Sequence, residues 1–497
     1  MVGIRADRAT VEAPAQEVPS GAPAIRWPLS LAILAASLAV GAAMRLWLAF
    51  NDDGILWPDE IYQSLEPAHR AAFGYGLLAW EFIDGARNWT FPGLIAAVLK
   101  LAGLAGIDSP RVYLRLVQII FCGVALGTAV AIFRLARSSG AGKLAGSCGS
   151  ACFSLMGVAV YFAPRAMSET ASALAVTAGL AISLPRQASR PQLWLGASIL
   201  SFAVLLRLQC ALFCVGLLGV LLLRRARRPL VEALIAFSLG AFVFGLIDRL
   251  TWGHWFHSAV AYLRFNALEG GAASFGASPP GYYPGTLVRA LGPLWVVIAV
   301  FALLAVVRAR ELFGIALVFF VPHWLSPHKE LRFLLPVIPV WCALAAVGLQ
   351  LALESRARWL RAGAPALVLG AAVYSAATLR QLTFHKLGQG DPFRTSAFDV
   401  GGPENRLLLA AHDAADLCGL KVLTRDLDWV GGYAYLHRRA PLYGSSGPAP
   451  TTRFFNYVIA ARGSVVGQVV SEDSGLVLAR IFDGGCEPDR SYNWHLN

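Results

Sequence analysis

Four ionisable side chains gather in the run Ser326–Phe333, between two long apolar stretches of the chain. They are His328, Lys329, Glu330 and Arg332, in a sequence that is 57% hydrophobic and only 14% charged. A charge held at or near a bilayer is costly unless it is paired or hydrated, so this placement indicates a polar task. Two cations, an imidazole and a carboxylate are suited to binding a phosphate whose lipid tail stays in the membrane. The alternative is a self-paired charge cluster that closes a loop and helps to fix the topology.

A second polar group, Asp59 and Glu60, follows the first apolar run. A carboxylate beside another one, or partly desolvated, accepts a proton more readily, so this pair could supply a general base. Helix capping is an equal alternative, because carboxylates at a helix N-terminus complement the helix dipole. Farther along the same loop, Trp80, Glu81 and Arg87 mix aromatic and charged groups. This mixture fits an aromatic belt at the membrane interface or a carbohydrate site built from ring stacking and charged hydrogen bonds.

A membrane scaffold is needed to hold these groups. The chain has 497 residues and many apolar runs of helix-spanning length, which predicts a polytopic membrane protein. The first apolar run lacks an Ala-x-Ala cleavage site and is predicted to remain as a helix. Several spans are shorter than the roughly 20 residues of a straight crossing, so broken helices are expected. The eleven predicted spans are 27–50, 112–133, 144–162, 170–184, 194–206, 210–223, 230–247, 286–307, 312–324, 333–353 and 364–379.

Basic clusters almost free of acids alternate along the chain with carboxylates. By the positive-inside rule the clusters mark cytoplasmic loops, so the acids fall outside, and eleven spans place the tail outside too. The stretch 91–106 is assigned to the outside as a re-entrant or interfacial helix. The net charge of +12 would indicate nucleic acid in a soluble protein, but this distribution argues against that partner. The basic clusters are 134–143, 186–190, 224–228, 308–310 and 356–361.

Beyond residue 379 the composition becomes mixed and polar. A helical pattern at 406–417 and strand-like runs at 420–423 and 457–460 predict a small α/β lobe. Its Cys418 and Cys486 could pair in an oxidising compartment or remain free buried thiols. No metal site is predicted from the other cysteines, which lie in spans as small apolar side chains. The predicted division is a cytoplasmic head 1–26, a membrane domain 27–379 with outer loops 51–111, 248–285 and 325–332, and an extracytoplasmic lobe 380–497.

Six polar motifs, in order along roughly residues 45–345, resemble the signature of lipid-phosphate-mannose-dependent mannosyltransferases, and most closely those of GPI-anchor and N-glycan assembly. Each motif alone is weak, but their shared order is specific. They are Pro58-Asp59-Glu60 with Trp80-Glu81-Phe82 and Arg87-x-Trp89-x-x-Pro92, then Arg165-x-x-Ser168-Glu169-Thr170, Leu206-Arg207-x-Gln209, Asp248-Arg249, Phe265-Asn266 and His328-Lys329-Glu330-x-Arg332-Phe333.

This resemblance implies a GT-C fold, in which an all-α membrane bundle carries large outer loops. It also implies an inverting glycosyltransferase without a metal or other cofactor. The expected donor is a polyprenyl-phosphate sugar, with mannose as the expected hexose, and the expected acceptor is a lipid-linked or cell-envelope glycan on the extracytoplasmic face. The usage of Ala, Gly, Leu and Arg indicates a bacterial member in the inner or plasma membrane. The acceptor, the linkage and the polyprenol length stay open.

The resemblance also assigns residue roles. Asp59 is the expected general base, with Glu60 as its neighbour or substitute. The donor phosphate is expected at His328, Lys329 and Arg332. Arg207 is expected there too or in an ion pair with Glu169, because Leu208 stands where the family usually has proline. Supporting roles fall to Glu330, Glu81, Arg87, Trp80, Glu169 and Asn266.

Two other classes of function fit some of these features. A transporter or flippase for a lipid-linked sugar would also need charges that bind phosphate. Such proteins usually bind near the bilayer midplane and often have repeated halves, neither of which the sequence displays. An inactive membrane scaffold is the third class. Sugar transfer, measured in variants of Asp59, Glu60 and Lys329, distinguishes the three.

Overall fold

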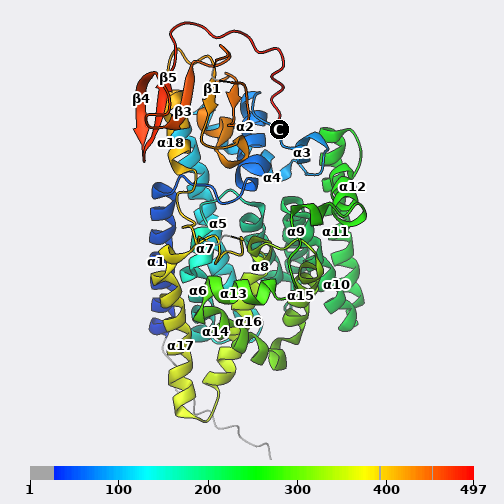
Figure 1. Cartoon of the computed structure of the whole chain (residues 1–497). Helices are drawn as coiled ribbons and strands as arrows, with labels where there is room; N and C mark the ends of the chain where they lie inside the picture. The colour runs from blue at the N-terminus through cyan, green and yellow to red at the C-terminus, as the bar shows by residue number, and fades with distance from the viewer. Residues whose placement is uncertain (1–26, 391–392, 450, 497) are drawn as a thin grey trace, which may run out of the picture.

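The computed structural model describes residues 27–390, 393–449 and 451–496, so the predicted head 1–26 lies outside the described residues. Helices dominate, and a small sheet lies near the C-terminus (Figure 1). In the first part of the described chain, the α-helices are α1 (Trp27–Asn51), α2 (Glu66–Phe73), α3 (Trp80–Ile83), α4 (Thr90–Leu104), α5 (Pro110–Ser138), α6 (Lys143–Leu155), α7 (Gly157–Tyr161), α8 (Ser168–Ser183) and α9 (Arg190–Leu206). They are followed by α10 (Ala211–Leu223), α11 (Arg227–Trp252), α12 (His257–Leu263), α13 (Tyr282–Leu291), α14 (Pro293–Leu304), α15 (Val306–Leu325), α16 (Ile338–Leu353), α17 (Arg358–Ala377), α18 (Gly402–His412) and α19 (Gly432–Leu436).

Each predicted span coincides with one helix or with two. The span 144–162 is divided between α6 and α7, because Met156 has an extended backbone. The span 286–307 is divided at Gly292, whose φ of +58° suits glycine and precedes the proline that opens α14. Among the described residues, α1, α5, α11 and α17 are long and apolar enough to cross a membrane. The number of eleven crossings therefore stays a prediction.

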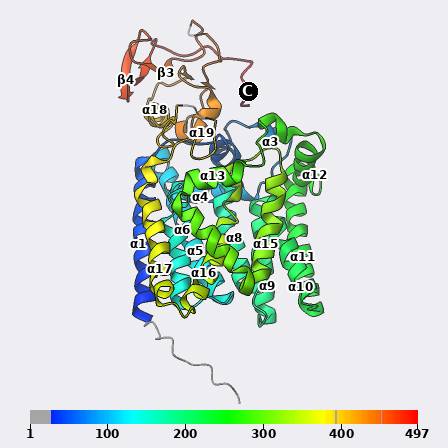
Figure 2. The same ribbon diagram turned by 60° about the horizontal axis from the view of Figure 1, so that its bottom comes forward.

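The two ends of the bundle differ in chemistry. At the end away from the sheet, ion pairs join the predicted cytoplasmic segments. Glu311 pairs with Arg186 at 3.0 Å and with Arg224 at 2.5 Å, and Glu354 pairs with Arg308 at 2.6 Å. The helix α4 lies at the opposite end together with α2 and α3 (Figures 1 and 2). The basic clusters thus gather on one face of the bundle, as the charge pattern predicts, although the side of the membrane stays a prediction.

The C-terminal segment forms the predicted α/β lobe. Its helix α18 and strands β1 (Leu420–Val422) and β3 (Tyr457–Ala461) occur where the sequence pattern places them. The strand order is β2-β1-β3-β5-β4, with β1 parallel to β2 and β3 and the remaining neighbours antiparallel. Cys418 and Cys486 form a disulfide with an S–S distance of 2.00 Å. The strands that the sequence analysis did not predict are β2 (Leu442–Tyr443), β4 (Gln468–Asp473) and β5 (Leu476–Arg480).

The lobe and the first loop share one apolar core. Tyr62 and Leu65 of the loop pack in the same cluster as Val430 and Tyr433 of the lobe. The lobe therefore packs against the loop that carries the predicted base.

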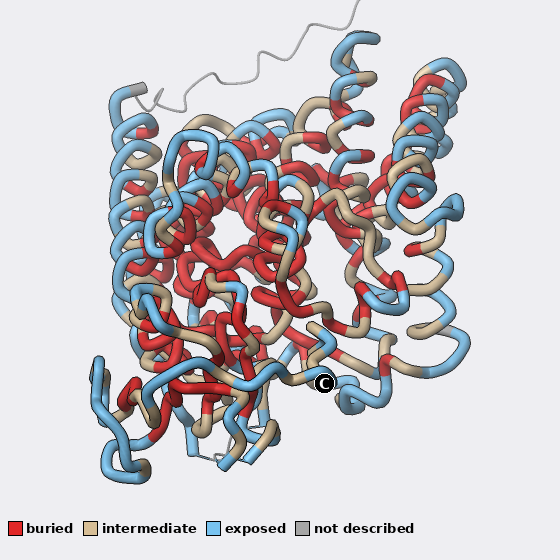
Figure 3. The backbone as a smooth tube through the Cα atoms, turned by 90° about the horizontal axis from the view of Figure 1, so that it is seen from above, coloured by how far each residue is buried: buried red, intermediate tan, exposed pale blue. Residues whose placement is uncertain are grey.

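Seen from above, buried segments fill the interior while many outer turns of the peripheral helices are exposed (Figure 3). Because these exposed turns carry large apolar side chains, they suit contact with lipid.

Candidate active site

A cavity of about 850 Å³ lies where the loops at the lobe end of the bundle meet the lobe, and we call it the large cavity. Its wall is built from the first loop, the start of α8, the α9–α10 junction, the loops before α13 and α16, and the lobe. A volume of this size accommodates a sugar and a phosphate group. All but one of the predicted site residues line it, namely Asp59, Trp80, Glu81, Arg87, Glu169, Arg207, Asn266, His328, Lys329, Glu330 and Arg332.

Arg332 joins the two polar motifs at the centre of this wall. Its guanidinium forms ion pairs with Asp59 at 2.5 Å, with Glu330 at 2.6 Å and with Glu169 at 3.3 Å. The residue is buried in the short 3-10 turn Leu331–Leu334. One cation thus holds carboxylates from the first loop, from α8 and from its own turn. The Asp59 motif and the Arg332 motif therefore open into one chamber.

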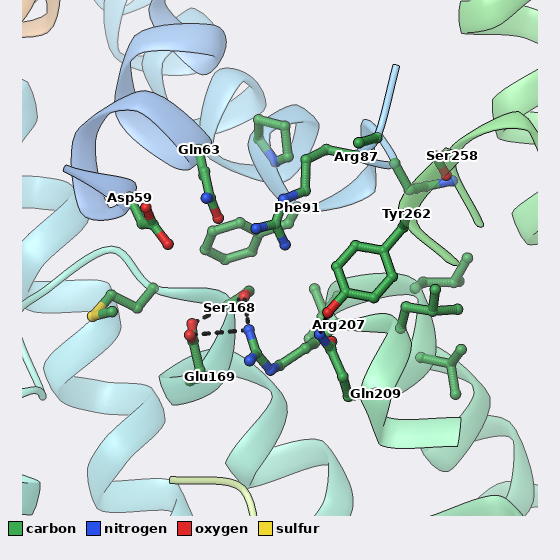
Figure 4. A pocket seen from close by; sticks show the side chains of 18 of the residues that line it. Asp59, Gln63, Arg87, Phe91, Ser168, Glu169, Arg207, Gln209, Ser258 and Tyr262 are labelled. Atoms are coloured by element: carbon green, nitrogen blue, oxygen red, sulfur yellow. Dashed lines mark hydrogen bonds and ion pairs between the residues drawn. The ribbon is translucent and has the colours of Figure 1, made fainter. Parts of the chain in front are cut away.

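Arg207 adopts the ion-paired alternative. Its side chain lies 3.0 Å from Glu169, and its extended backbone ends α9 at the cavity wall. Figure 4 shows this pair on one side of an adjoining cavity of about 50 Å³, with Asp59 and Arg87 facing it from the other side. Arg207 still lines both cavities, although part of its charge is already offset by Glu169.

Glu60 is the predicted site residue that the fold turns away. Its carboxylate is buried and pairs with Arg165 at 2.9 Å, beside a separate cavity of about 30 Å³. It also accepts a hydrogen bond from the backbone N–H of Leu56. Burial raises the pKa of Glu60, and the charge of Arg165 partly opposes this effect. Because consecutive residues of a helical turn point about 100° apart, Asp59 and Glu60 face different cavities. Asp59 therefore lines the large cavity and Glu60 does not, while the substitute role of Glu60 stays a prediction.

Lys329 and His328 differ in how far their polar groups are already used. The Lys329 ammonium donates to the carbonyl groups of Ser278 at 2.9 Å and Ser326 at 2.6 Å, and it forms no ion pair with a described carboxylate. His328 instead lies 2.9 Å from Glu330, and this hydrogen bond raises the pKa of His328. Burial alone would raise the pKa of Glu330, but Arg332 and His328 outweigh it and lower that pKa.

Arg87 is the second cation of the cavity that forms no ion pair with a described carboxylate. Its guanidinium lies 5.9 Å from the ring centre of Tyr262, and its buried Nε atom has no hydrogen-bond partner. The resemblance predicts only a supporting role for Arg87. Its charge partly opposes the rise in the pKa of Glu81. Because its guanidinium forms no ion pair with a described carboxylate, Arg87 is as strong a candidate for binding an anion as Lys329, and stronger than the carboxylate-paired Arg332 and Arg207.

The remaining supporting residues shape the wall. Glu81 accepts a hydrogen bond from Gln63 at 2.7 Å. Trp80 packs on Phe265 with ring centres 4.5 Å apart. Asn266 donates to the carbonyl of Tyr262 at 2.9 Å, a bond within the second outer loop. These contacts position the loops around the cavity and leave it open to a ligand.

Part of the wall comes from residues that the sequence analysis did not single out. Gln389, Asp428 and Trp429 lie in the predicted lobe, beyond every motif of the resemblance. An isolated Asp-Trp pair carries no signal of its own in a sequence, so only the packing of the lobe could reveal it. Within the described ranges, no group of three or more His, Cys, Asp or Glu residues is suited to hold a metal ion.

Comparison with known proteins supplies a family. A model of the Alg9-like mannosyltransferase family matches residues 37–386. GPI mannosyltransferase 3 of Yarrowia lipolytica is 29% identical over 65% of this chain and 64% of its own length. The chain spans between 53% and 64% of the length of the curated relatives described by these comparisons.

Solved structures are similar to this chain in fold. ArnT from Cupriavidus metallidurans, bound to undecaprenyl phosphate, aligns with a TM-score of 0.55 and 14% identity over 93% of this chain and 99% of that one. The oligosaccharyltransferase of Archaeoglobus fulgidus aligns with a TM-score of 0.55 and 11% identity over 88% of this chain and 69% of that one. Together with the long apolar helices, the shared fold makes the chain an integral membrane protein. The expected membrane glycosyltransferase fold is thereby confirmed.

Proposed function

The chain belongs to the Alg9-like mannosyltransferase family, and on that premise we propose that it transfers mannose from a polyprenyl-phosphate donor to a glycan hydroxyl group with inversion at the anomeric carbon. One observation carries the proposal: Asp59 lines the same cavity as Lys329 and Arg87, the two cations without a described ion-pair partner. A base and anion-binding groups thus line one cavity that accommodates a sugar.

Asp59 is the proposed general base. As the acceptor oxygen attacks the anomeric carbon, its proton passes to the Asp59 carboxylate, and the bond from that carbon to the phosphate oxygen breaks. Arg332 holds Asp59 at 2.5 Å. A donor phosphate that approaches Arg332 would compete with the carboxylates for this cation and loosen Asp59 for its role. Because attack occurs opposite the leaving group, the configuration is inverted.

The polyprenyl phosphate leaves with the electron pair of the broken bond, so one negative charge develops on it. Fixed cations that face this charge stabilise the transition state more than the ground state. Lys329 and Arg87 are available for this purpose. Arg332 and Arg207 already share carboxylates, and their proposed part is to position Asp59 and Glu169 and to contact the phosphate secondarily.

The apolar part of the wall suits the lipid. Leu212, Pro322 and Phe275 line the large cavity from α10, α15 and the second loop. A donor tail could extend along these side chains into the bilayer while its phosphate remains among the cations. The disulfide Cys418–Cys486 favours an oxidising compartment for the lobe, and the basic clusters at the other end favour a cytoplasmic side there. Both support an active site that faces away from the cytoplasm.

The proposal is tested with the full chain in lipid nanodiscs, supplied with short-chain polyprenyl-phosphate [³H]mannose and octyl α-mannopyranoside. We expect labelled disaccharide whose new anomeric centre is opposite to that of the donor. GDP-mannose and polyprenyl-phosphate glucose serve as control donors and should give little product. Retention of the donor configuration, or movement of the lipid across the membrane without sugar transfer, would contradict the proposal.

A further inference from the structure

Part of the large cavity is walled by residues outside the family match. That match ends at residue 386, whereas Gly388, Gln389, Asp428, Trp429 and Leu496 also line the cavity. The lobe is therefore part of the cavity wall, where it contributes the carboxylate of Asp428 and the indole of Trp429.

The Asp428 carboxylate is only partly satisfied within the protein, where the backbone N–H groups of Asp428 and Trp429 oppose a rise in its pKa. Its Oδ1 atom is buried without a hydrogen-bond partner, and it forms no ion pair with any cation in the part of the chain that the structure describes. Burial, and then the charge of Asp426, raise the pKa of Asp428. Asp426, two residues earlier, is exposed and accepts a hydrogen bond from the hydroxyl of Ser445. Because Asp428 also lines the large cavity, a polar ligand there can contact its carboxylate.

The turn that carries Asp428 is fixed to the loop of the proposed base. The Tyr62 hydroxyl donates to the carbonyl of Leu427, and it lies 3.2 Å from the carbonyl of Val430. Tyr62 follows Asp59 by three residues, and Asp59 lines the same cavity. The short 3-10 helix Leu427–Trp429 is therefore held in register with the proposed base.

Trp429 adds an aromatic face beside this carboxylate. Its exposed fraction is 36%, although the residues that flank its turn are packed in the shared core. Within the described chain its ring forms no close pair with another aromatic ring, whereas the rings of Tyr433 and Trp494 pair with their centres 5.1 Å apart. An indole that is left unstacked at a cavity wall can cover the apolar face of a flat ligand.

We propose that Asp428 and Trp429 form the binding subsite for the acceptor, and that this acceptor is a pyranose sugar with neighbouring hydroxyl groups. A carboxylate oxygen of Asp428 that faces the cavity can accept hydrogen bonds from adjacent hydroxyls, because an ionised carboxylate offers acceptors only. The C–H face of the same sugar ring packs on Trp429. The subsite lies on the lobe, and the donor phosphate is bound on the bundle side of the cavity. This inference rests on the proposed function for its reaction, but the binding of the sugar is independent of turnover.

Steady-state kinetics with octyl α-mannopyranoside test the subsite in the full chain. Asp428→Asn should raise the KM for this acceptor about 10- to 100-fold, as expected for a lost hydrogen bond to a charged group. Trp429→Ala should raise it by about three- to tenfold, and Trp429→Phe by less, because a smaller aromatic face remains. The kcat and the slow hydrolysis of the donor by water should stay unchanged in each variant. Asp426→Asn is the matched control and should behave as the wild type.

Saturation-transfer NMR with methyl α-mannopyranoside separates the two proposals. A signal in the wild type that is lost in Asp428→Asn supports the subsite even where no sugar transfer occurs, in which case only the proposed function fails. An unchanged KM and an unchanged NMR signal in both Asp428→Asn and Trp429→Ala would overturn the subsite. A fall in kcat at constant acceptor KM would overturn it as well and move Asp428 into proton transfer. Circular dichroism and thermal melting establish that each variant is folded.

Discussion

Two buried arginines at the lobe end of the bundle bind carboxylates in the same way, yet they stand beside different spaces. Arg332 pairs with Asp59, Glu330 and Glu169 beside the large cavity of about 850 Å³. Arg165 pairs with Glu60 at 2.9 Å and Asp52 at 3.2 Å beside a cavity of only about 30 Å³. The chemistry of the two clusters is nearly identical, and the room around them differs greatly.

The difference separates a structural ion network from a candidate reactive one. A cavity of about 30 Å³ is too small for a sugar, which favours a structural role for the carboxylates around Arg165. Arg165 also donates to the carbonyl of Gly54 at 2.9 Å, which ties the start of the first loop to the segment before α8. The carboxylates around Arg332 meet a space that fits a substrate. Burial and charge alone would therefore not distinguish these clusters.

The two adjacent carboxylates, Asp59 and Glu60, should give the largest difference in activity between the two clusters. Asp59→Asn should lower kcat about a hundred- to ten-thousand-fold, because a general base contributes an effect of that size. Glu60→Gln should leave the kcat of the folded fraction nearly unchanged while it lowers the melting temperature. Sugar transfer per folded molecule, with thermal unfolding in parallel, measures both. Equal losses of kcat in the two variants would erase the distinction between the clusters.

Removal of the structural cation should act on stability. Arg165→Met leaves Asp52 and Glu60 buried without a cation, so we expect a loss of about 3–5 kcal/mol in the free energy of unfolding. Arg462 pairs with Glu472 at the surface of the lobe and provides the control. Arg462→Met should cost about 1 kcal/mol or less. Denaturant unfolding in mild detergent compares the two, and similar losses would show that the Arg165 network carries no special weight.

The cations without ion-pair partners sharpen the comparison within the large cavity. Lys329→Met and Arg87→Met should each lower kcat/KM about 10- to 100-fold, because each removes a charged hydrogen bond to the leaving phosphate. Lys421 is a matched control, since its ammonium also donates to two backbone carbonyls, Gly447 at 2.8 Å and Pro448 at 2.6 Å. Lys421→Met should leave kcat/KM unchanged. An equal kinetic loss there would remove the phosphate role from Lys329.

A buried carboxylate without an ion-pair partner among the described residues gives an effect that depends on pH. Burial raises the pKa of Glu66 to about 7, although three backbone N–H groups, those of Leu77, Ala434 and Tyr433, oppose the rise. Because the folded pKa exceeds the unfolded value near 4.5, the folded state holds the extra proton between these values. Its contribution of up to about 3 kcal/mol is present below pH 4.5 and is lost as the pH rises through 7.

Glu66→Gln should remove this part of the pH dependence. Between pH 5 and about 8, the melting temperature of the variant should therefore fall less than that of the wild type. The exposed Glu472→Gln is the control and should retain the wild-type slope. Melting curves at a series of pH values measure the difference. A slope that survives in Glu66→Gln would place the titrating group elsewhere.

Much of the fold could be predicted because helices embedded in a bilayer require long apolar runs, and such runs are visible in the sequence. Apolar runs located α1, α5 and α11 to within a few residues, and short strand-like runs located β1 and β3. The helix breaks at Met156 and Gly292 were harder to predict, since the apolar runs continue across them. The short strand β2 pairs with β1 through tertiary contacts and leaves almost no local pattern.

The sequence alone determined the class of the protein, the order of its helices and the residues capable of chemistry, because hydrophobic length and motif order are properties of the linear chain. Only the tertiary structure decided which of those residues share a space. A turn of about 100° between neighbours sends Asp59 and Glu60 to different cavities. Packing of the lobe on the first loop brings Asp428, far along the chain, to the same cavity as Asp59. Side-chain direction and long-range packing are set by the folded core, and no local pattern encodes them.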